Sequence, residues 1–417
     1  MPHEMSIAAP AALLTAEGAL PAANMPLDQS RAGEATVTVE RADGARLAEI
    51  ESDWRDLVAR TCEPNVFMAP AMLRSAERHC ASGGIVSLLA WQRGSDRNKL
   101  VGIWAFAVAA PAQSPLPCKV LCAPAVPHGY LGTPVLDEAF ATETLGAILD
   151  FIAGDRSLPK IIALDPVAAD GRAMNALGRV LRARGTAPYA VAVGERPVLQ
   201  SDLEVKQYFE RALSSASRKK LRQHRRRLEE KGALAVMRVD TPDSVVKAFD
   251  EFLALEAAGW KGRRGSALAC APADAQFAKD MVAALARRGE AAIYALSLAG
   301  KPISMQVVLR SGAIAYTWKT AYDETYADFS PGMLLLEEYT KAFLTDKTIA
   351  RVDSCAYDTS SFMAAWSERQ AIAQVWIDAR RGGTLAFVTL SRLQRAYLRL
   401  RAAAKDLHRA GRRLWKR

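Results

Sequence analysis

The predicted order of secondary-structure elements occurs twice along the chain, and few folds are compatible with such a repeat. Hydrophobic periodicity in residues 234–378 predicts a strand, two helices, three strands joined by tight turns, a helix, a strand, a short helix and a final strand. Residues 36–193 predict the same order, with equivalent elements about 190–210 residues apart. We therefore predict a mixed α/β fold made of two pseudo-repeated domains.

The second copy shows the clearer pattern. Its predicted helices are Asp243–Ala258, Ala273–Arg288, Pro331–Leu344 and Ser361–Arg369. Its predicted strands are Leu234–Val239, Ala292–Leu298, Ile303–Leu309, Ile314–Thr320, Ile349–Cys355 and Ala373–Asp378. In the first copy, the first predicted helix is Leu47–Ala59.

The 417 residues are enough for two domains that each bury a core. We predict a disordered leader at 1–35, a first domain at 36–200, a second at 201–380 and a basic tail at 381–417. The leader is rich in Ala and Pro and lacks the basic cluster that precedes the apolar part of a signal peptide. No apolar run is long enough to cross a bilayer, so we expect a cytoplasmic protein.

The positive charge of the chain is concentrated in two segments. Residues 214–231 hold eight Lys or Arg and two Glu, and residues 391–417 hold ten basic residues and one Asp. Because the net charge of the chain is +10, the remainder is slightly acidic. A generally positive surface that would attract nucleic acid is therefore disfavoured.

The basic tail also shows helical periodicity. Apolar or small residues recur every three or four positions, at Leu393, Tyr397, Leu400, Ala404, Leu407, Gly411 and Leu414. A helix of this kind binds an anionic membrane surface, packs on a partner or on the protein itself, or remains disordered. The sequence leaves these three possibilities open.

The six cysteines and five histidines are scattered, and the only close cysteine pair, Cys118 and Cys122, lacks a second pair. We therefore predict reduced thiols and no metal site. The sequence also contains no G-x-S-x-G nucleophile elbow, Walker loop or dinucleotide-binding fingerprint. A direct transfer reaction without a covalent enzyme intermediate is the simplest chemistry that remains.

Three stretches of the second copy carry a resemblance to a known family: LEAAGWKGRRGSAL, GKPISMQVVL and YTWKTAYDETYADFSPGMLLLEEYTKAF. They resemble acetyltransferases of the CelD/BcsL family of cellulose and exopolysaccharide synthesis. These are tandem GNAT proteins related to the Fem aminoacyltransferases. The resemblance covers about residues 36–379 and implies an acetyl-CoA or other acyl-CoA co-substrate.

In a GNAT fold, the coenzyme pyrophosphate binds where the central strand leads into a helix, because free N–H groups at a helix N-terminus attract anions. In this chain the junction reads Ser330-Pro331-Gly332-Met333. Pro331 suits the first helical turn, Ser330 is a possible cap, and Gly332 allows close approach of a ligand. An ordinary helix start is the alternative. The first copy has no comparable loop before Thr144, so we assign the coenzyme to the second copy.

Acyl transfer also needs a base for the acceptor and a proton donor for the leaving thiolate. Asp353, at the end of a strand, resembles the family's strand-end Asp and is a candidate base or acceptor-positioning group; a structural cap is the alternative. Tyr322 and Asp323 directly follow the central strand, and we take them as further catalytic candidates. Both residues are equally suited to a turn.

Several basic and polar residues are candidates for binding the acceptor. Lys261 belongs to the Trp-Lys pair that the family shares, and Lys319 lies on the central strand with its facing undetermined. Arg218, Lys219 and Arg222 lie within one turn of a predicted basic helix and suit a phosphate. In the first copy, His128 and Tyr130 follow the central strand.

The sequence thus predicts transfer of an acetyl or acyl group to a hydroxyl or amino group of a sugar, nucleotide-sugar, polysaccharide or lipid-linked precursor. Two alternatives remain open. One is a Fem-like transfer from aminoacyl-tRNA to a cell-wall precursor, and the other is a non-catalytic scaffold that binds membrane or nucleic acid. The predicted partners of the main hypothesis are acyl-CoA, a glycan acceptor and an anionic membrane, with nucleic acid disfavoured.

Overall fold

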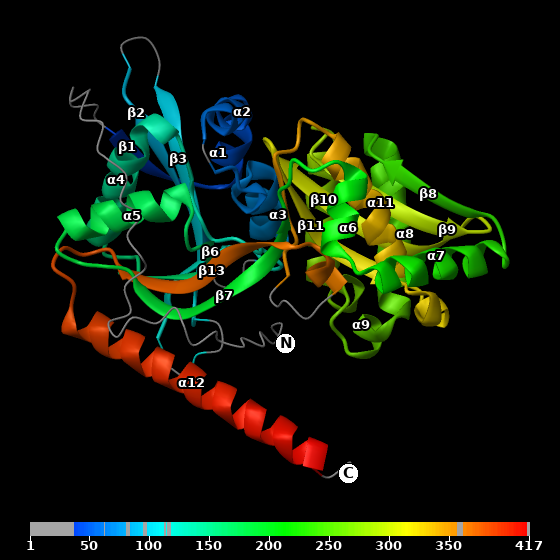
Figure 1. Cartoon of the computed structure of the whole chain (residues 1–417). Coiled ribbons are helices and arrows are strands. Elements are labelled where there is room, and N and C mark those ends of the chain that lie inside the picture. The colour runs from blue at the N-terminus through cyan, green and yellow to red at the C-terminus, as the bar shows by residue number, and fades with distance from the viewer. Residues whose placement is uncertain are drawn as a thin grey trace. The chain divides into compact units, whose positions relative to one another are not determined.

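The structure, a computed structural model, describes residues 37–414 except 62, 81–83, 95–97, 112–113, 115–117 and 357–361, with side chains as far as Ala404. The predicted leader at 1–35 lies outside the described residues. The chain divides into two compact units (Figure 1). The N-terminal unit comprises residues up to Glu77, Ala81–Gly194 and Ala371–Arg417, and the C-terminal unit comprises Glu195–Gln370 with the short stretch Arg78–Cys80.

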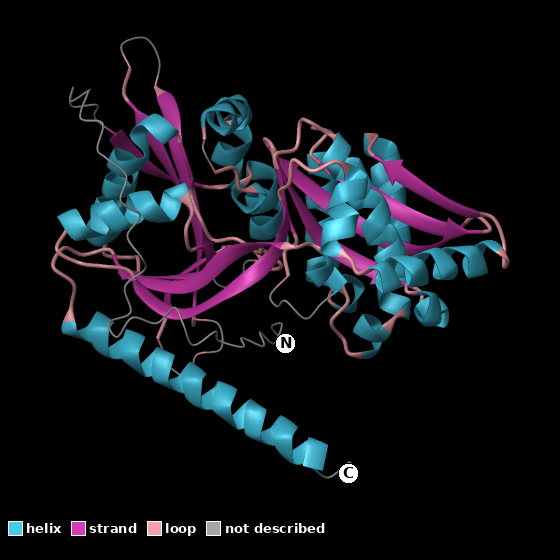
Figure 2. Cartoon of the chain, viewed as in Figure 1, coloured by secondary structure: helices cyan, strands magenta, loops and turns pink. Residues whose placement is uncertain are grey.

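The N-terminal unit is a mixed sheet with helices packed on it (Figure 2). Its strands are β1 (Val37–Ala42), β2 (Ile85–Gln92), β3 (Lys99–Ala109), β4 (Val120–Ala123), β5 (Val135–Leu136), β6 (Ile161–Ala168), the first part of β7 (Tyr189–Leu199) and most of β13 (Glu368–Asp378). Its helices are α1 (Gly44–Glu49), α2 (Glu51–Arg60), α3 (Pro70–His79), α4 (Ala141–Gly154), α5 (Arg172–Ala183) and α12 (Leu385–Leu414), with 3-10 turns η1 (Val66–Met68) and η2 (Glu138–Phe140). The strand order is β1-β2-β3-β4-β6-β13, and the β4–β6 pair is parallel.

The C-terminal unit has the same architecture. Its sheet runs β7-β12-β11-β10-β9-β8, with β8 (Leu234–Val239), β9 (Ala291–Leu298), β10 (Lys301–Ser311), β11 (Ile314–Tyr322) and β12 (Arg351–Asp353). The helices are α6 (Val205–Ala212), α7 (Ser215–Glu229), α8 (Pro242–Ala258), α9 (Trp260–Arg263), α10 (Pro272–Ala286) and α11 (Pro331–Thr345), with 3-10 turns η3 (Leu268–Cys270), η4 (Glu324–Phe329) and η5 (Phe362–Ala365). Here β11 and β12 form the parallel pair. The predicted mixed α/β repeat is therefore confirmed.

Alternation along the strands builds a core on each side of the C-terminal sheet. Tyr294 and Leu296 of β9 pack with Leu335 and Tyr339 of α11 on one side. On the other side, Trp318 of β11 stacks on Phe249 of α8 at 6.4 Å. The sheet and the start of α11 are thus held rigidly from both faces.

Three helices differ in their bounds or continuity from the prediction. The helix predicted at Leu47–Ala59 is split into α1 and α2, because the fully buried Ile50 adopts a non-helical backbone (φ −83°, ψ 14°). The short helix predicted at Ser361–Arg369 is only the 3-10 turn η5, after which β13 begins at Glu368. In the tail, the helix begins already at Leu385.

The division between the units differs from the predicted boundary at residue 200 in one respect. Strand β7 passes from the N-terminal into the C-terminal unit at Glu195, and β13 passes back at Ala371. Most of the last strand therefore pairs with β6, from Asp378 opposite Ile161 to Ile372 opposite Ala168. Sequence periodicity identifies a strand, but it does not identify the sheet that the strand joins.

Candidate active site

The central feature of the candidate site is an opening between β11 and β12. The parallel pairing ends at Tyr316 opposite Asp353, whereas β11 continues to Tyr322. Within the part of the chain that the structure describes, the last residues of β11 therefore have no strand beside them on that edge. This leaves room between two parallel strands for a ligand to approach the backbone.

A pocket of about 470 Å³ adjoins this end of β11. Its walls come from the end of α8, from α9, from Thr320–Tyr322 of β11, from η4 and from the start of α11. All these elements belong to the C-terminal unit. The pocket brings together Lys261, Tyr322 and the Ser330–Met333 junction, which the sequence had singled out separately.

The junction at the start of α11 has the geometry of an anion site. Ser330 adopts a left-handed backbone (φ 51°, ψ 55°) directly before the helix. The amides of Ser330 and Met333 donate to the carbonyl oxygens of Ala327 and Ser330, both at 2.9 Å, and Pro331 has no N–H, so the Gly332 amide is the donor of this junction that remains for a ligand. The Ser330 side chain makes no cap hydrogen bond, so its predicted capping role is wrong. A Cβ built on Gly332 would meet no atom within 4 Å, so the pocket side of this residue is open. The Gly332 amide and the positive end of the α11 dipole are thus presented to a ligand here.

Lys261 lies in the pocket wall with a defined set of partners. Its Nζ donates to Glu256 Oε1 at 2.9 Å and to the carbonyl oxygen of Thr320 at 2.7 Å. Glu256 is buried and also accepts from the Leu268 amide at 2.8 Å. Burial lowers the pKa of Lys261, although the Glu256 carboxylate opposes this effect. The lysine is therefore an oriented donor at the pocket edge.

Lys319 is buried on β11, one residue before the pocket-lining Thr320. Burial lowers the pKa of its ammonium to about 8, while the carboxylate of Glu256 acts in the opposite direction. Lys319 in turn lowers the pKa of Lys261. A lysine whose pKa lies near 8 is partly neutral at physiological pH, so it is able to accept a proton.

The burial of Lys319 predicts a dependence of stability on pH. The unfolded chain holds this proton up to about pH 10.5, whereas the folded protein releases it near pH 8, so the unfolding free energy should rise between these values. Below pH 8 the buried charge opposes folding by about 3 kcal/mol. Lys319→Met should therefore raise the unfolding free energy at pH 7 by about 1 to 3 kcal/mol and abolish the rise. Urea unfolding at pH 7, 8, 9 and 10 measures both effects. If the unfolding free energy rises equally with pH in the parent protein and in Lys319→Met, this pKa is contradicted.

Asp353 is placed differently from a base that meets substrate. The residue is 1% exposed, and its two carboxylate oxygens lie 3.1 and 3.2 Å from Nη1 of the fully buried Arg196. Oδ1 also accepts from the Cys355 amide at 2.7 Å. Because the carboxylate is enclosed and ion-paired, these contacts disfavour a role as base. They suit the alternative of a structural cap, which fixes the end of β12 beside the opening.

The two other catalytic candidates have different surroundings. Tyr322 lines the pocket. Asp323 instead caps η4, because its Oδ1 accepts from the amide and the hydroxyl of Thr325 at 3.0 and 2.7 Å. The turn alternative therefore fits Asp323, and Tyr322 remains the candidate that faces the ligand space.

The basic helix α7 packs by a thin apolar stripe. Leu221 and Leu228 are buried on it, together with the unpredicted His224, whose ring meets Phe329 of η4 at 6.4 Å. Arg225 is half-buried and pairs with Glu338 of α11 at 2.5 Å. This helix therefore braces the element that begins at the anion site.

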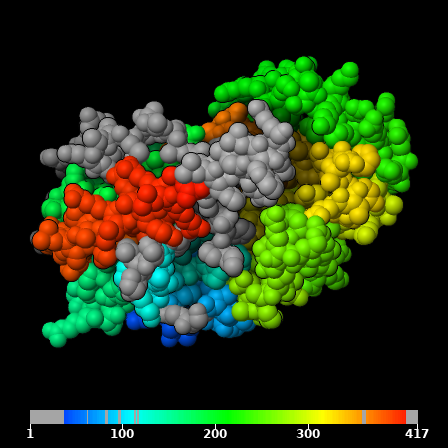
Figure 3. Space-filling model, turned by 90° about the horizontal axis from the view of Figure 1, so that it is seen from below, coloured from blue at the N-terminus to red at the C-terminus, as the bar shows by residue number. Residues whose placement is uncertain are grey.

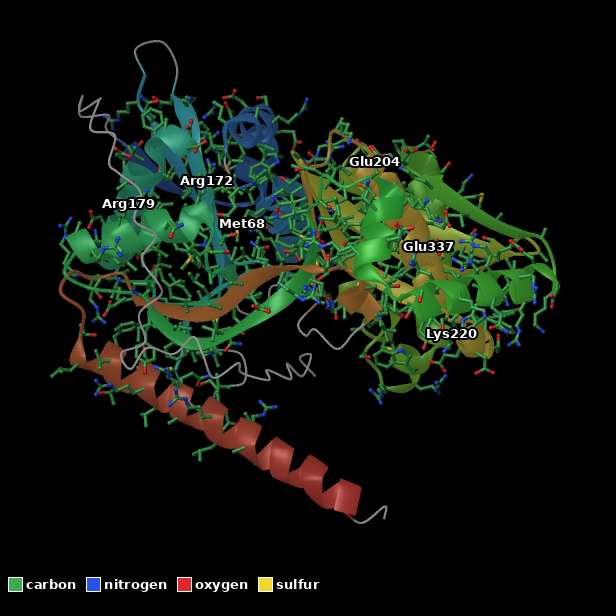
Figure 4. All side chains as sticks on the ribbon, in the orientation of Figure 1. Met68, Arg172, Arg179, Glu204, Lys220 and Glu337 are labelled. Carbon is green, nitrogen blue, oxygen red and sulfur yellow. The ribbon has the colours of Figure 1, made fainter. Side chains whose placement is uncertain are left out.

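The basic residues of α7 that were predicted to bind a phosphate do not line the pocket. Lys219 and Arg222 are exposed, and Arg218 lies 3.5 Å from Glu210. Figure 4 labels the neighbouring Lys220 among the side chains that project from this helix. A role of these cations in binding an acceptor stays a proposal.

His128 and Tyr130 belong to the N-terminal unit. Tyr130 is buried, with its ring edge against Phe67 at 5.9 Å, so it is a core residue of that unit. His128 is half-buried in a left-handed backbone conformation (φ 57°). The geometry therefore gives Tyr130 a packing role, and a substrate role of His128 stays a proposal.

The helix start in the N-terminal unit that corresponds to α11 is unsuited to an anion. There, Asp137 caps η2 through the Ala139 amide and pairs with Arg60 and Lys99, and Glu143 lies in the first turn of α4. Carboxylates at this helix N-terminus would repel a pyrophosphate. The assignment of the coenzyme to the C-terminal copy rests on this contrast as well as on the pocket.

Trp260, the other member of the Trp-Lys pair, lies at the pocket. Its side chain is 38% exposed, lines the pocket and has the guanidinium of Arg264 over its ring at 5.1 Å. The sequence signal for the exposure of Trp260 was the glycines that flank it. A Cβ on Gly262 would lie 1.7 Å from the carbonyl oxygen of Ala257, so only glycine permits the close return of α9 onto α8. This corner turns the indole away from the core.

Residues 215–360 match the family model described as an acetyltransferase (GNAT) domain, and this range includes every element of the pocket except η5, which contributes Phe362. The chain carries a GNAT acetyltransferase domain. Its enzymatic class is therefore that of a GNAT-type acyltransferase, as the sequence predicted. The GNAT fold implies acyl-CoA as co-substrate, and the Gly332 amide at the positive end of the α11 dipole suits an anionic ligand of this kind.

Solved structures extend the likeness beyond this domain. The chain is similar to the crystal structure of FemX, with 14% identity, a TM-score of 0.51 and coverage of 80% of this chain and 96% of that one. It is also similar to the C-terminal domain of a putative lysylphosphatidylglycerol synthetase from Agrobacterium fabrum (12% identity, 82% and 95% coverage, TM-score 0.48). A third match is a tandem GNAT protein from the clavulanic acid biosynthesis pathway (13% identity, 82% and 99% coverage, TM-score 0.42). No curated protein matches the chain.

Among the described residues, no helix is long and apolar enough to cross a membrane, and no group of His, Cys, Asp and Glu is arranged to hold a metal ion. The narrower resemblance to the CelD/BcsL family and its polysaccharide chemistry lies beyond what these matches show. Both belong with the proposals that follow.

Proposed function

We propose that the GNAT domain transfers an acetyl or other acyl group from acyl-CoA to a hydroxyl or amino group of a sugar. The acceptor would be a nucleotide-sugar, a polysaccharide or a lipid-linked precursor of cellulose or another exopolysaccharide, as in the CelD/BcsL family. The observation that carries this proposal is the pocket that joins the end of β11 to the start of α11, where we place the coenzyme pyrophosphate. It offers one continuous space for a thioester and its pyrophosphate.

The reaction needs two proton movements. The acceptor oxygen or nitrogen attacks the thioester carbonyl carbon, its proton passes to a base, the carbon–sulfur bond breaks, and the coenzyme thiolate takes up a proton. We assign the second transfer to the Tyr322 hydroxyl, because this residue lines the pocket. For the first we propose the amine of Lys319, which is buried on β11 beside the pocket-lining Thr320 and whose pKa burial lowers to about 8.

Other pocket residues would position the reactants. The Lys261 ammonium, held by Glu256 and the Thr320 carbonyl oxygen, is a donor for the carbonyl oxygen of the acyl group or for an anionic acceptor. The exposed face of Trp260 offers a stacking surface for a sugar or adenine ring. Arg218, Lys219, Arg222 and His128 remain proposed acceptor contacts.

We further propose that the enzyme works in the cytoplasm beside the membrane, where lipid-linked precursors are accessible. The basic charge of the tail supports this location, since the ten basic residues of 391–417 would attract anionic lipid.

An acceptor screen tests the proposed chemistry. Acetyl-CoA should bind with saturable heat in calorimetry, and coenzyme release should rise at least tenfold above hydrolysis with a sugar acceptor. Nucleotide-sugars and free amino sugars form the first panel. Absence of acetyl-CoA binding would contradict the proposal, and transfer from an aminoacyl-tRNA would replace it by the Fem-like alternative.

Removal of the Tyr322 hydroxyl tests its role as a proton donor. Tyr322→Phe should lower kcat about 10- to 100-fold with little change in the KM for acetyl-CoA, because the aromatic ring that lines the pocket is kept. Steady-state kinetics separates the two constants. Tyr326→Phe, on the neighbouring η4, is the matched control and should keep kcat within twofold. An unchanged kcat for Tyr322→Phe would remove this residue from the mechanism.

A further inference from the structure

Helix α12 uses one of its faces to pack on its own unit. Phe387 is buried in a cluster with Trp376 of β13 and Val191 of β7, and Val388, Leu390 and Leu398 pack against the same cluster. Ser391 and Gln394 are buried on this side too. Of the three possibilities that the sequence left open for the tail, packing on the protein itself is thus realised, but only by this face of the helix.

The opposite face of α12 presents leucines to solvent. Leu385 is 87% exposed, Leu393 51% and Leu400 72%. With a rotation of about 100° per residue, these side chains fall within an arc of about 80°, and the exposed Thr389, Ala396 and Ala403 lie among them. Figure 3 shows this helix, orange to red, as a ridge on one side of the molecule.

The charges beside this stripe have one sign. Arg392 and Arg399 are exposed at its edge, and residues 379–405 contain no Asp or Glu. Arg395 instead lies over the Tyr189 ring at 5.8 Å, on the packed side. The exposed face therefore combines apolar side chains with cations and lacks any acidic group in this range.

We propose that this face of α12, defined by Leu385, Leu393, Leu400, Arg392 and Arg399, docks on the surface of an anionic lipid bilayer. A bilayer accepts the leucines at its acyl boundary and the arginines at its headgroups. A second copy of the helix would bring cations against cations. A nucleic acid would pair with the arginines but leave the leucines in water.

The helix would lie in the plane of the interface. Its 30 residues correspond to about 45 Å, and no described helix is apolar enough to span a membrane. The face that packs on Trp376 would then hold the N-terminal unit at the surface. This inference deepens the membrane location proposed above and is independent of the acyl-transfer chemistry.

Vesicle cosedimentation of the full-length protein tests the proposal. The protein should sediment with vesicles of phosphatidylcholine containing about 30% phosphatidylglycerol, and it should sediment at least tenfold less with phosphatidylcholine alone or in about 0.5 M salt. Leu393→Glu/Leu400→Glu should reduce binding to the anionic vesicles at least tenfold, because both leucines would have to carry charge into the interface.

A matched control separates the face from total charge. Met237→Glu/Val246→Glu adds the same two charges at apolar positions that are 52% and 42% exposed in the C-terminal unit, and it should bind vesicles like the parent protein. Gly332→Glu should lose acetyl-CoA but keep vesicle binding, so failure of the coenzyme site is distinguished from failure of this proposal.

Three results would overturn the proposal. The first is absence of binding to anionic vesicles, and the second is equal binding by Leu393→Glu/Leu400→Glu. The third is a dimer in vesicle-free solution that the same two substitutions convert to a monomer, which would assign the face to a second copy of the chain.

Discussion

Gly332→Glu should lower the affinity for acetyl-CoA at least 100-fold while leaving the protein folded. A side chain at this position meets no protein atom within 4 Å of its Cβ, so it extends into the pocket. The carboxylate would occupy the place of the coenzyme phosphates and repel them, at a cost of about 3 kcal/mol. A glutamate in the first turn of a helix is favourable for the helix itself, so the fold should tolerate it.

Titration calorimetry with acetyl-CoA measures the loss, and thermal unfolding confirms the fold. Gly146→Glu is a suitable control, because this glycine lies on α4 of the N-terminal unit and its Cβ would also meet no atom within 4 Å. The control should keep the acetyl-CoA affinity within twofold. Equal affinities of the parent protein and Gly332→Glu would rule out the start of α11 as the coenzyme site.

Arg196→Met should lower the free energy of unfolding by about 3 to 5 kcal/mol, because it leaves the buried carboxylate of Asp353 without its cation. Arg196 is 0% exposed and Asp353 is 1% exposed, so water does not replace the missing partner. The pair also joins β7 to β12, whose register places Val198 opposite Asp353. Its loss should loosen the end of β12 beside the opening and reduce kcat as well.

Urea unfolding measures this loss. The double variant Arg196→Met/Asp353→Leu removes both charges and should recover most of the lost stability, because no isolated buried charge remains. Arg226→Met, which removes an exposed i,i+4 pair with Glu230, should change the unfolding free energy by less than about 1 kcal/mol. A double variant as unstable as Arg196→Met would show that packing, and not the unpaired charge, is responsible.

The elements of the fold were predictable because each leaves a local signature. The strands β8 and β9 and the helices α8, α10 and α11 were predicted within about two residues, since one face of each is apolar with the period of its own structure. The start of α11 was predictable for a similar reason, because Pro at the first turn and Gly beside it mark such a junction.

Asp353, Trp260 and the tail show where the prediction from sequence ends. Asp353 looks like a base by its position at a strand end, but Arg196, 157 positions earlier in the chain, encloses it. Tryptophan is a residue type that is common in protein cores, yet the tight return at Gly262 turns Trp260 toward the pocket. The periodicity of the tail predicts a helix, although it does not distinguish the face that packs on the protein from the face that stays exposed.

By itself the sequence determined the duplicated α/β order, the resemblance to GNAT acetyltransferases and the position at which α11 begins, because these depend on neighbouring residues and their periodicity. Only the tertiary structure decided the neighbours of each titratable group: the Arg196 partner of Asp353, the Glu256 partner of Lys261 and the burial that lowers the pKa of Lys319. These environments depend on segments that are distant in sequence. The chemistry available to a side chain follows from its solvation and its partners, and folding alone establishes both.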